Sequence, residues 1–311
     1  MGQISASQPP NPLFWIYSLW KFSRPHTIIG TTLSVWGLFA IAASRQGGID
    51  EFLDVSRLWE VGLAWISCLC GNVYIVGLNQ LEDIEIDRIN KPNLPLASGE
   101  FSRRQGWSIV AVTGILALLI SAFQGTWLFG MVSISLLLGT AYSLPPIRLK
   151  RFPFWASFCI FTVRGIIVNL GLFLHFHRGF PISPEVWALT LFVLVFTFVI
   201  AIFKDIPDME GDRQYNITTW TLKLGKDSIF NISRWVITSC YLGMAIGGVL
   251  CLPSLNPIPI VVSHLGALLL FWWGSRSVDL EDKTSIASCY QFIWKLFFLE
   301  YLMFPATCFW V

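Results

Sequence analysis

Residues 184–203 read PEVWALTLFVLVFTFVIAIF, twenty residues whose only charge is Glu185 near the start. A helix of about 20 predominantly apolar residues is long enough to cross the hydrocarbon core of a bilayer. The stretch lacks the alternation of a membrane-spanning strand, and only helices and closed barrels satisfy their backbone hydrogen bonds in lipid. It therefore predicts a transmembrane helix.

Similar apolar stretches fill most of the chain. Of its 311 residues, 54% are apolar and 13% are charged, whereas a soluble domain carries about 25% charged residues. This composition excludes a disordered chain and a nucleic-acid binder with a basic surface. We predict an all-α integral membrane protein whose bundle has about nine transmembrane helices, over residues 27–44, 59–80, 107–122, 126–142, 153–175, 184–203, 230–252, 257–274 and 288–310.

The basic residues predict how this bundle is oriented. If the N-terminus is cytoplasmic, three of the 21 Lys and Arg residues (Arg45, Arg57 and Arg178) fall in outer loops, two fall within spans, and sixteen lie on the inner side. Cytoplasmic loops carry the excess of basic residues in membrane proteins. We therefore expect a cytoplasmic N-terminal segment, 1–26, followed by a single transmembrane domain, 27–311.

Two short acidic segments match each other. Residues 79–88 read NQLEDIEIDR, and residues 204–213 read KDIPDMEGDR. An offset of 125 residues (208 − 83) places Asp83 on Asp208 and also aligns the Asp-Arg pair that follows in each segment. Each segment follows an expected span, and the two spans are four apart, so both segments enter the bundle from the same face. This pattern indicates a parallel internal repeat with a site at the interface of its halves.

The spacing within these segments predicts a divalent metal site. Residues three or four apart share one face of a helix, so Asn79 and the aspartates of each segment form a polar row. Two acidic rows that meet at the mouth of a bundle repel each other unless cations separate them. Hard carboxylate oxygens suit Mg²⁺, which binds through carboxylates together with substrate phosphates. We expect a magnesium-bound diphosphate, with Asn79 beside it and with the metal ligands Asp83, Asp87, Asp205, Asp208 and Asp212.

Basic residues near the acidic segments are candidates to bind the phosphate oxygens of that ligand. Each of them also serves as an inner-face topology signal, and the sequence leaves both roles open. These residues are Arg24, Arg148, Lys150 and Lys204.

The two acidic segments resemble the motifs of the UbiA-type intramembrane prenyltransferases. Segment 79–88 is similar to the first NxxxDxxxD motif of that family, and segment 204–213 is similar to the second. Three further stretches are similar to the homogentisate prenyltransferase branch of the family: RPHT at 24–27, NKPNLPLASGE at 90–100 and YSLPPIRLK at 142–150. The resemblance covers nearly the whole chain.

The resemblance implies a Mg²⁺-dependent aromatic prenyltransferase. In this branch the ring of homogentisate attacks an allylic diphosphate, phytyl or geranylgeranyl diphosphate, and loses its carboxylate as CO₂. The product is a methyl-prenyl-benzoquinol of the tocopherol pathway. The resemblance also implies catalytic roles for Asp83, Asp87, Asp208 and Asp212, and for Tyr142, which would contact the carbocation or the diphosphate. Together with an N-terminal segment in which no transit peptide is visible, it implies a cyanobacterial thylakoid or plasma membrane, and the basic residues predict that the loops of the site lie on the cytoplasmic side.

Arg164 lies within the fifth expected span. An ionisable residue inside a membrane is costly and marks a functional site by default. Arg164 either faces the carboxylate of homogentisate or pairs with a neighbouring helix, and both interpretations remain open.

Other functions also fit parts of the pattern. A UbiA-type enzyme with another acceptor or donor, of the chlorophyll, plastoquinone or another quinone type, shares the same motifs. A secondary transporter also has repeats and buried charges, although acidic rows at helix ends suit a diphosphate better than a midplane ion site. A CDP-alcohol phosphotransferase also uses paired aspartates, but its DGxxAR…GxxxD signature is missing here.

Overall fold

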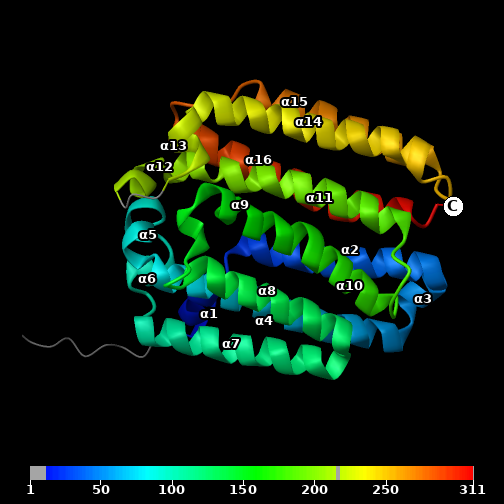
Figure 1. Cartoon of the computed structure of the whole chain (residues 1–311), viewed down its shortest axis with the longest axis horizontal. Coiled ribbons are helices and arrows are strands. Elements are labelled where there is room, and N and C mark those ends of the chain that lie inside the picture. The colour runs from blue at the N-terminus through cyan, green and yellow to red at the C-terminus, as the bar shows by residue number, and fades with distance from the viewer. Residues whose placement is uncertain (1–11, 215–217, 311) are drawn as a thin grey trace, which may run out of the picture.

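The computed structural model describes residues 12–214 and 218–310, and in this part of the chain every regular element is helical. Long helices run side by side to form the bundle (Figure 1). They are α2 (Pro25–Gln46), α4 (Val55–Glu82), α7 (Arg103–Gln124), α8 (Thr126–Ser143), α9 (Pro153–Phe161), α10 (Val168–Phe176), α11 (Pro184–Phe203), α14 (Lys226–Cys251), α15 (Pro257–Ser275) and α16 (Lys283–Thr307). A π-helical segment, η2 (Thr162–Ile167), joins α9 to α10.

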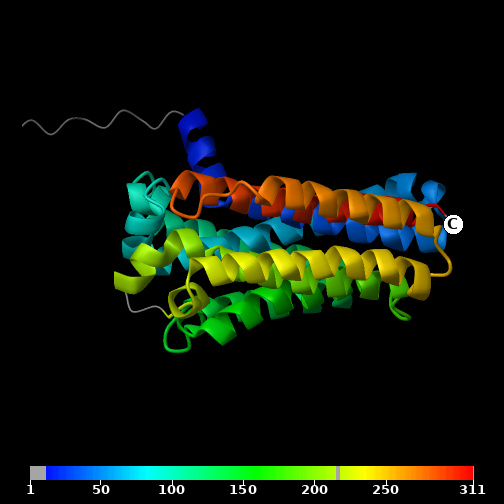
Figure 2. The ribbon, with the colours of Figure 1, turned by 90° about the horizontal axis from the view of Figure 1, so that it is seen from above.

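Short helices lie in the connections. They are α1 (Pro12–Phe22), α3 (Ile49–Leu53), α5 (Ile84–Asn90), α6 (Pro95–Ser98), η1 (Leu149–Arg151), α12 (Asp205–Gln214) and α13 (Trp220–Leu224). Two views related by 90° place α5, α6, α12 and α13 at one end of the bundle and α3 with the C-terminus at the other (Figures 1 and 2). The prediction of an all-α bundle is confirmed.

Eight helices within the described ranges are long and apolar enough to cross a membrane. They match the first eight expected spans to within a few residues. The ninth, 288–310, falls on α16, which is 25 residues long and carries Lys283, Lys295 and Glu300. The count of nine spans and the cytoplasmic position of the N-terminus stay predictions.

The predicted internal repeat is visible in the order of the helices. The succession α4, α5, α7, α8 recurs about 125 residues later as α11, α12, α14, α15. The two short helices that carry the acidic segments, α5 and α12, pack against each other at the same end of the bundle (Figure 1). The repeat is therefore parallel, and it brings the acidic segments together.

The bundle buries large aromatic side chains at its centre and exposes large apolar side chains on its outside. Phe173 and Phe176 of α10, Phe196 of α11 and Phe297 of α16 are fully buried at the centre. Its outer surface exposes many large apolar side chains, among them Phe123, which is 90% exposed. In water such a surface would be a continuous apolar patch, whereas a lipid bilayer accommodates it.

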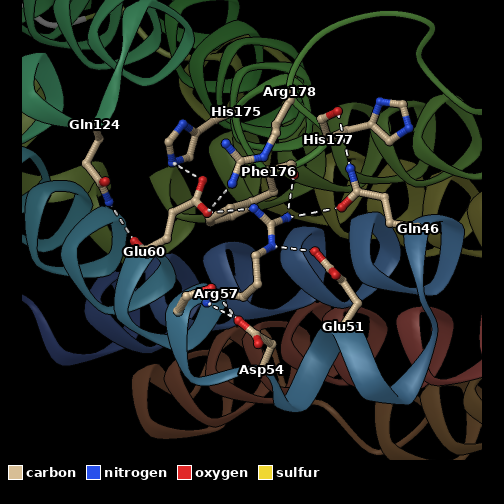
Figure 3. Close-up of polar contacts among 11 residues, drawn as sticks. Gln46, Glu51, Asp54, Arg57, Glu60, Gln124, His175, Phe176, His177 and Arg178 are labelled. Carbon is tan, nitrogen blue, oxygen red and sulfur yellow. Dashed lines mark hydrogen bonds and ion pairs between the residues drawn. The ribbon is translucent and has the colours of Figure 1, made fainter.

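At the end of the bundle away from α5 and α12, Arg57 is the centre of a polar cluster (Figure 3). Arg57 is 5% exposed. Its Nε lies 2.7 Å from Oε1 of Glu51, its Nη1 lies 2.6 Å from Oε2 of Glu60, and its Nη2 donates to the carbonyl of Phe176 at 2.6 Å. Arg178 lies 3.4 Å from Glu60 as well. The cluster thus ties α3, α4 and α10 together.

Arg45, the remaining basic residue expected in the outer loops, pairs with buried Glu185. All three arginines that were expected on the outer side therefore have an acidic partner at this end of the bundle.

Candidate active site

The first acidic segment spans the junction between α4 and α5. The sequence predicts a continuous helical row of Asn79, Asp83 and Asp87, but α4 ends at Glu82, and Asp83 takes a non-helical conformation with φ −113° and ψ 19°. The row survives this break, because the Asp83 N–H bonds to the Asn79 carbonyl at 3.1 Å and the Asp87 N–H bonds to the Asp83 carbonyl at 2.7 Å. The Asn79 amide also donates to the Asp83 carboxylate at 3.2 Å.

The second segment has the same arrangement. Helix α11 ends at Phe203, and α12 begins at Asp205. Asp205, Asp208 and Asp212 are each 8–9% exposed. Since α12 packs on α5, the carboxylates of both segments lie around one site, as the sequence predicts.

Two of the predicted phosphate-binding residues contact Asp83. Lys150 Nζ lies 2.6 Å from Asp83 Oδ2, and Arg148 Nη2 lies 3.1 Å from Asp83 Oδ1. Lys150 is 8% exposed, and its burial lowers the pKa of its ammonium group, although Asp83 opposes this shift. Both residues belong to the turn that follows α8.

The other two predicted residues also lie beside carboxylates. Lys204 lies 3.5 Å from Asp205. Arg24 Nη2 donates to the Asn79 side-chain oxygen at 3.4 Å and lies 3.9 Å from Asp87 Oδ2. In the sequence Arg24 and Lys204 are 180 residues apart (204 − 24), and the fold brings both to the two acidic segments.

Arg24 and Arg148 have left-handed backbone conformations, with φ of 53° and 40°. A residue with a Cβ pays about 1–2 kcal/mol for this conformation, and such strain concentrates at functional sites. Both residues lie in a connection between two helices, and both side chains reach an acidic segment. The strain therefore accompanies the positioning of these two guanidinium groups.

Lys91 is a site residue that the sequence reasoning did not single out. Its Nζ lies 2.5 Å from Asp208 Oδ2, so it joins the loop after α5 to helix α12. A signal was available, since Lys91 follows the first acidic segment by three residues and lies within the NKPNLPLASGE stretch. Arg88, which ends the first segment, instead pairs with Glu85 on the exposed surface.

A large cavity opens among these charges. This mouth cavity, about 690 Å³ in volume, is lined by the five aspartates of the two segments and by five basic residues, Lys21, Arg24, Lys91, Lys150 and Lys204. Arg148 lines neither this cavity nor the one described next. Its contacts are with Asp83 and the carbonyl of Glu82, which makes it a positioning residue for Asp83.

A second cavity continues from the mouth into the bundle. This inner cavity, about 290 Å³ in volume, shares Arg24, His26, Asn79, Tyr142, Lys204 and Tyr290 with the mouth cavity. Its remaining walls are mostly apolar and include Trp294, Met131 and Leu136. Tyr142 thus stands at the boundary between the charged and the apolar space.

The carboxylates fit a divalent cation by their chemistry and by their environment. Burial raises the pKa of Asp212 to about 7, and repulsion from Asp208 and Asp205 adds to the shift. Burial also raises the pKa of Asp87, whose Oδ2 is buried and receives no hydrogen bond. Buried carboxylates that are hard to ionise alone are stabilised by a bound cation.

Among the side chains that the structure describes, no three of Asp, Glu, His or Cys are close enough together to hold one metal ion. Basic side chains pair with the aspartates instead. A metal-diphosphate would fit here only if these pairs exchanged, with the aspartates turning to the metal and the Lys and Arg side chains to the phosphates.

Arg164 lies in the π-helical segment η2 and lines the inner cavity, away from the acidic mouth. Its guanidinium carbon lies 4.8 Å from the ring centroid of Trp294 and 5.6 Å from that of Phe297. Both rings belong to α16. Of the two interpretations that the sequence leaves open, contact with a neighbouring helix is seen, but through aromatic faces rather than through an acidic partner.

Comparison with known proteins identifies relatives over nearly the whole chain. The sequence profile of the UbiA prenyltransferase family matches residues 32–296. The homogentisate phytyltransferase of Synechocystis sp. is 57% identical over 294 residues, which cover 93% of this chain and 95% of that protein. The chloroplastic homogentisate phytyltransferase 1 of Arabidopsis thaliana is 42% identical over 299 residues, which cover 93% of this chain and 74% of that protein.

Solved structures share the fold at much lower sequence identity. A UbiA homolog from Archaeoglobus fulgidus, bound to GPP and Mg²⁺, superposes with a TM-score of 0.64 at 16% identity, covering 93% of this chain and 99% of that one.

Proposed function

The chain belongs to the UbiA prenyltransferase family, and we propose that it transfers a phytyl group from phytyl diphosphate to homogentisate. In this reaction the bond between C1 of the prenyl chain and the diphosphate oxygen breaks, and C1 bonds to a carbon of the aromatic ring. The ring carbon gives up its proton and the diphosphate leaves. The side chain loses CO₂ and takes up a proton to become a methyl group, so the product is a methyl-phytyl-benzoquinol.

The observation that carries this proposal is the pairing of two acidic segments with five basic side chains around the mouth of an apolar cavity. A diphosphate needs cations, and a prenyl chain needs an apolar space next to them. Both requirements are met within one continuous opening at the interface of the two repeats.

The aspartates of both segments would hold Mg²⁺, with Asp83 and Asp87 on one side and Asp205, Asp208 and Asp212 on the other. When bound, this metal supplies Lewis-acid chemistry that neutralises the charge of the departing diphosphate. The solved relative from Archaeoglobus fulgidus, with GPP and Mg²⁺ bound, supports the choice of ligand class.

The chain's own cations bind and orient the diphosphate. Lys150, Lys91, Lys204 and Arg24 line the mouth cavity and are held at the carboxylates by ion pairs. These positions let each side chain turn to a phosphate oxygen with little movement. Pre-positioned charges of this kind stabilise the developing charge on a leaving group without reorganisation.

The prenyl carbocation is protected from water by the inner cavity. Tyr142 stands at its entrance, and the rings of Tyr290 and Trp294 face it. Aromatic faces stabilise cations at short range. We assign Tyr142 to contact with the reacting end of the prenyl chain, where charged and apolar walls meet.

The choice of homogentisate and phytyl diphosphate rests on the relatives, because two proteins that cover 93% of this chain at 57% and 42% identity are named homogentisate phytyltransferases. Geranylgeranyl diphosphate is the alternative donor. We further propose a multi-pass location in a cyanobacterial thylakoid or plasma membrane, with the site on the cytoplasmic side.

The test is an assay that crosses acceptors with donors in membranes that contain the protein and Mg²⁺. We expect homogentisate with phytyl diphosphate to give the highest kcat/KM, and geranylgeranyl diphosphate to be the slower donor. The proposal is wrong if no aromatic acceptor is prenylated, or if vesicles accumulate a labelled substrate without forming product.

A further inference from the structure

The two cavities differ in their balance of charge, since basic and acidic residues are equal in number around the mouth cavity. Five aspartates line the mouth cavity, whereas no described Asp or Glu lines the inner cavity. The inner cavity has three basic residues in its wall, Arg24, Lys204 and Arg164. Arg24 and Lys204 also reach the mouth cavity, where Asp87 and Asp205 lie beside them. Arg164 lines only the inner cavity and does not reach the mouth cavity.

No hydrogen bond or ion pair joins the Arg164 side chain to another residue in the described part of the chain. Its contacts there are the faces of Trp294 and Phe297. Cation–π contacts hold a guanidinium plane in place but leave its N–H donors free. A charge deep in an apolar bundle is costly without an anionic partner. The N–H donors of Arg164 are therefore available to an anionic ligand.

The backbone beneath Arg164 is held rigidly. The amide of Asn169 donates to the Gly165 carbonyl at 3.0 Å, and the hydroxyl of Tyr301 donates to the Asn169 side-chain oxygen at 2.7 Å. A Cβ on Gly165 would lie 2.6 Å from the Cα of Leu194, so the segment lies against α11 with no space between them. These contacts fix a π-helical turn, a deviation that is frequent at functional sites.

An aromatic wall connects Arg164 to the mouth. The ring centroids of His26 and Trp294 are 4.8 Å apart, and those of Tyr290 and Trp294 are 6.3 Å apart. His26 and Tyr290 line both cavities. A small aromatic acid whose carboxylate meets Arg164 would thus place its ring against this wall, between Arg164 and the diphosphate site.

We propose that Arg164 binds the carboxylate of the acceptor and orients its ring toward the prenyl C1. This inference rests on the proposed function and adds a residue that selects acidic acceptors. Arg suits the role because its planar fork matches a carboxylate bidentately. Arg164 is the one basic residue of the inner cavity's described lining that does not also line the mouth cavity, so a carboxylate bound to it lies at the inner end and the acceptor has one orientation.

The kinetic test compares R164M and R164K with K295M in the purified full-length protein. Lys295 is a matched control, because it is a second basic residue within the bundle that lies on the exposed face of α16. We expect R164M to raise the KM for homogentisate about ten- to a hundredfold, with the KM for phytyl diphosphate unchanged. R164K, which keeps the charge, should raise the KM for homogentisate less than R164M does. K295M should have the same KM values as the wild type.

An equilibrium measurement separates this proposal from the proposed function. Phenylacetate and phenylacetamide have nearly the same shape and differ in charge. We expect the wild type and K295M to bind phenylacetate about tenfold or more tightly than phenylacetamide, and R164M to bind both equally.

Two results would overturn the assignment: a preference for phenylacetate that persists in R164M, or a KM increase for the diphosphate instead of homogentisate. If the wild type does not prenylate homogentisate at all, the proposed function is wrong. The phenylacetate and phenylacetamide affinities would then still decide whether Arg164 binds a carboxylate.

Discussion

Lys91 and Asp208 are 117 residues apart in the sequence, and Lys91 Nζ lies 2.5 Å from Asp208 Oδ2. The lysine follows the first acidic segment and the aspartate lies within the second. Their ion pair bridges the two repeats directly across the mouth cavity. The site is therefore shared between the repeats, and neither repeat alone contains it.

This pair gives the first prediction. K91A should raise the KM for the prenyl diphosphate about tenfold, because a cation that would bind a phosphate oxygen is lost. The Mg²⁺ concentration needed for half-maximal activity should not rise, because Asp208 becomes free to bind the metal. Titrations of diphosphate and of Mg²⁺ measure the two effects separately, and a weaker response to Mg²⁺ would argue against the exchange of partners.

The acidic segments give the second prediction. D83N and D208N should each lower kcat/KM by about a hundredfold or more, since each removes a charge opposite the metal while keeping the shape of the side chain. D50N is the control, because Asp50 is exposed on α3 at the far end of the bundle. Activity retained in both site variants would contradict the metal assignment.

The Arg57 cluster gives a prediction about stability alone. R57M removes the Arg57 partner of Glu51 and Glu60. Breaking a buried ion pair in this way lowers the free energy of unfolding by about 3–5 kcal/mol. We expect a lower unfolding temperature in detergent with no change in the KM for either substrate. R178A, whose side chain is 70% exposed, should cost less than about 1 kcal/mol. An equal loss of stability in the two variants would show that burial does not determine how much each arginine contributes to stability.

Gly165 tests whether the close contact between η2 and α11 positions Arg164. A methyl group there meets the backbone of Leu194, and such overpacking costs about 1–3 kcal/mol. We expect G165A to raise the KM for homogentisate as well, since the segment that carries Arg164 must move. Gly130 of α8 has open space around its Cα, so G130A should be neutral or slightly stabilising. An unchanged KM in G165A would mean that the position of Arg164 does not depend on this contact.

The architecture could be predicted from the sequence because composition dominates it. Apolar stretches located the long helices to within a few residues, and the 125-residue offset located both halves of the site. These signals are local, or are repeated at a fixed distance, so one sequence is enough to find them.

The contacts within the site could not be predicted in the same way. The break in the helix at Asp83, the pair between Lys91 and Asp208, and the position of Arg148 behind Asp83 depend on how distant segments pack. The sequence marked Arg164 as unusual, but its aromatic neighbours lie on α16, about 130 residues later. Tertiary packing, which leaves no periodic signal, decides these relationships.

The central claim is that the paired acidic segments drive metal-dependent prenylation of homogentisate. The most direct measurement uses purified protein in lipid nanodiscs, phytyl diphosphate, and homogentisate labelled in its carboxyl group, and it quantifies the labelled CO₂ and the diphosphate that are released. We predict equal amounts of both with Mg²⁺ and neither after chelation with EDTA, with activity restored when Mg²⁺ is added back. Release that persists in EDTA, or diphosphate released from homogentisate-containing mixtures without CO₂, would contradict the account.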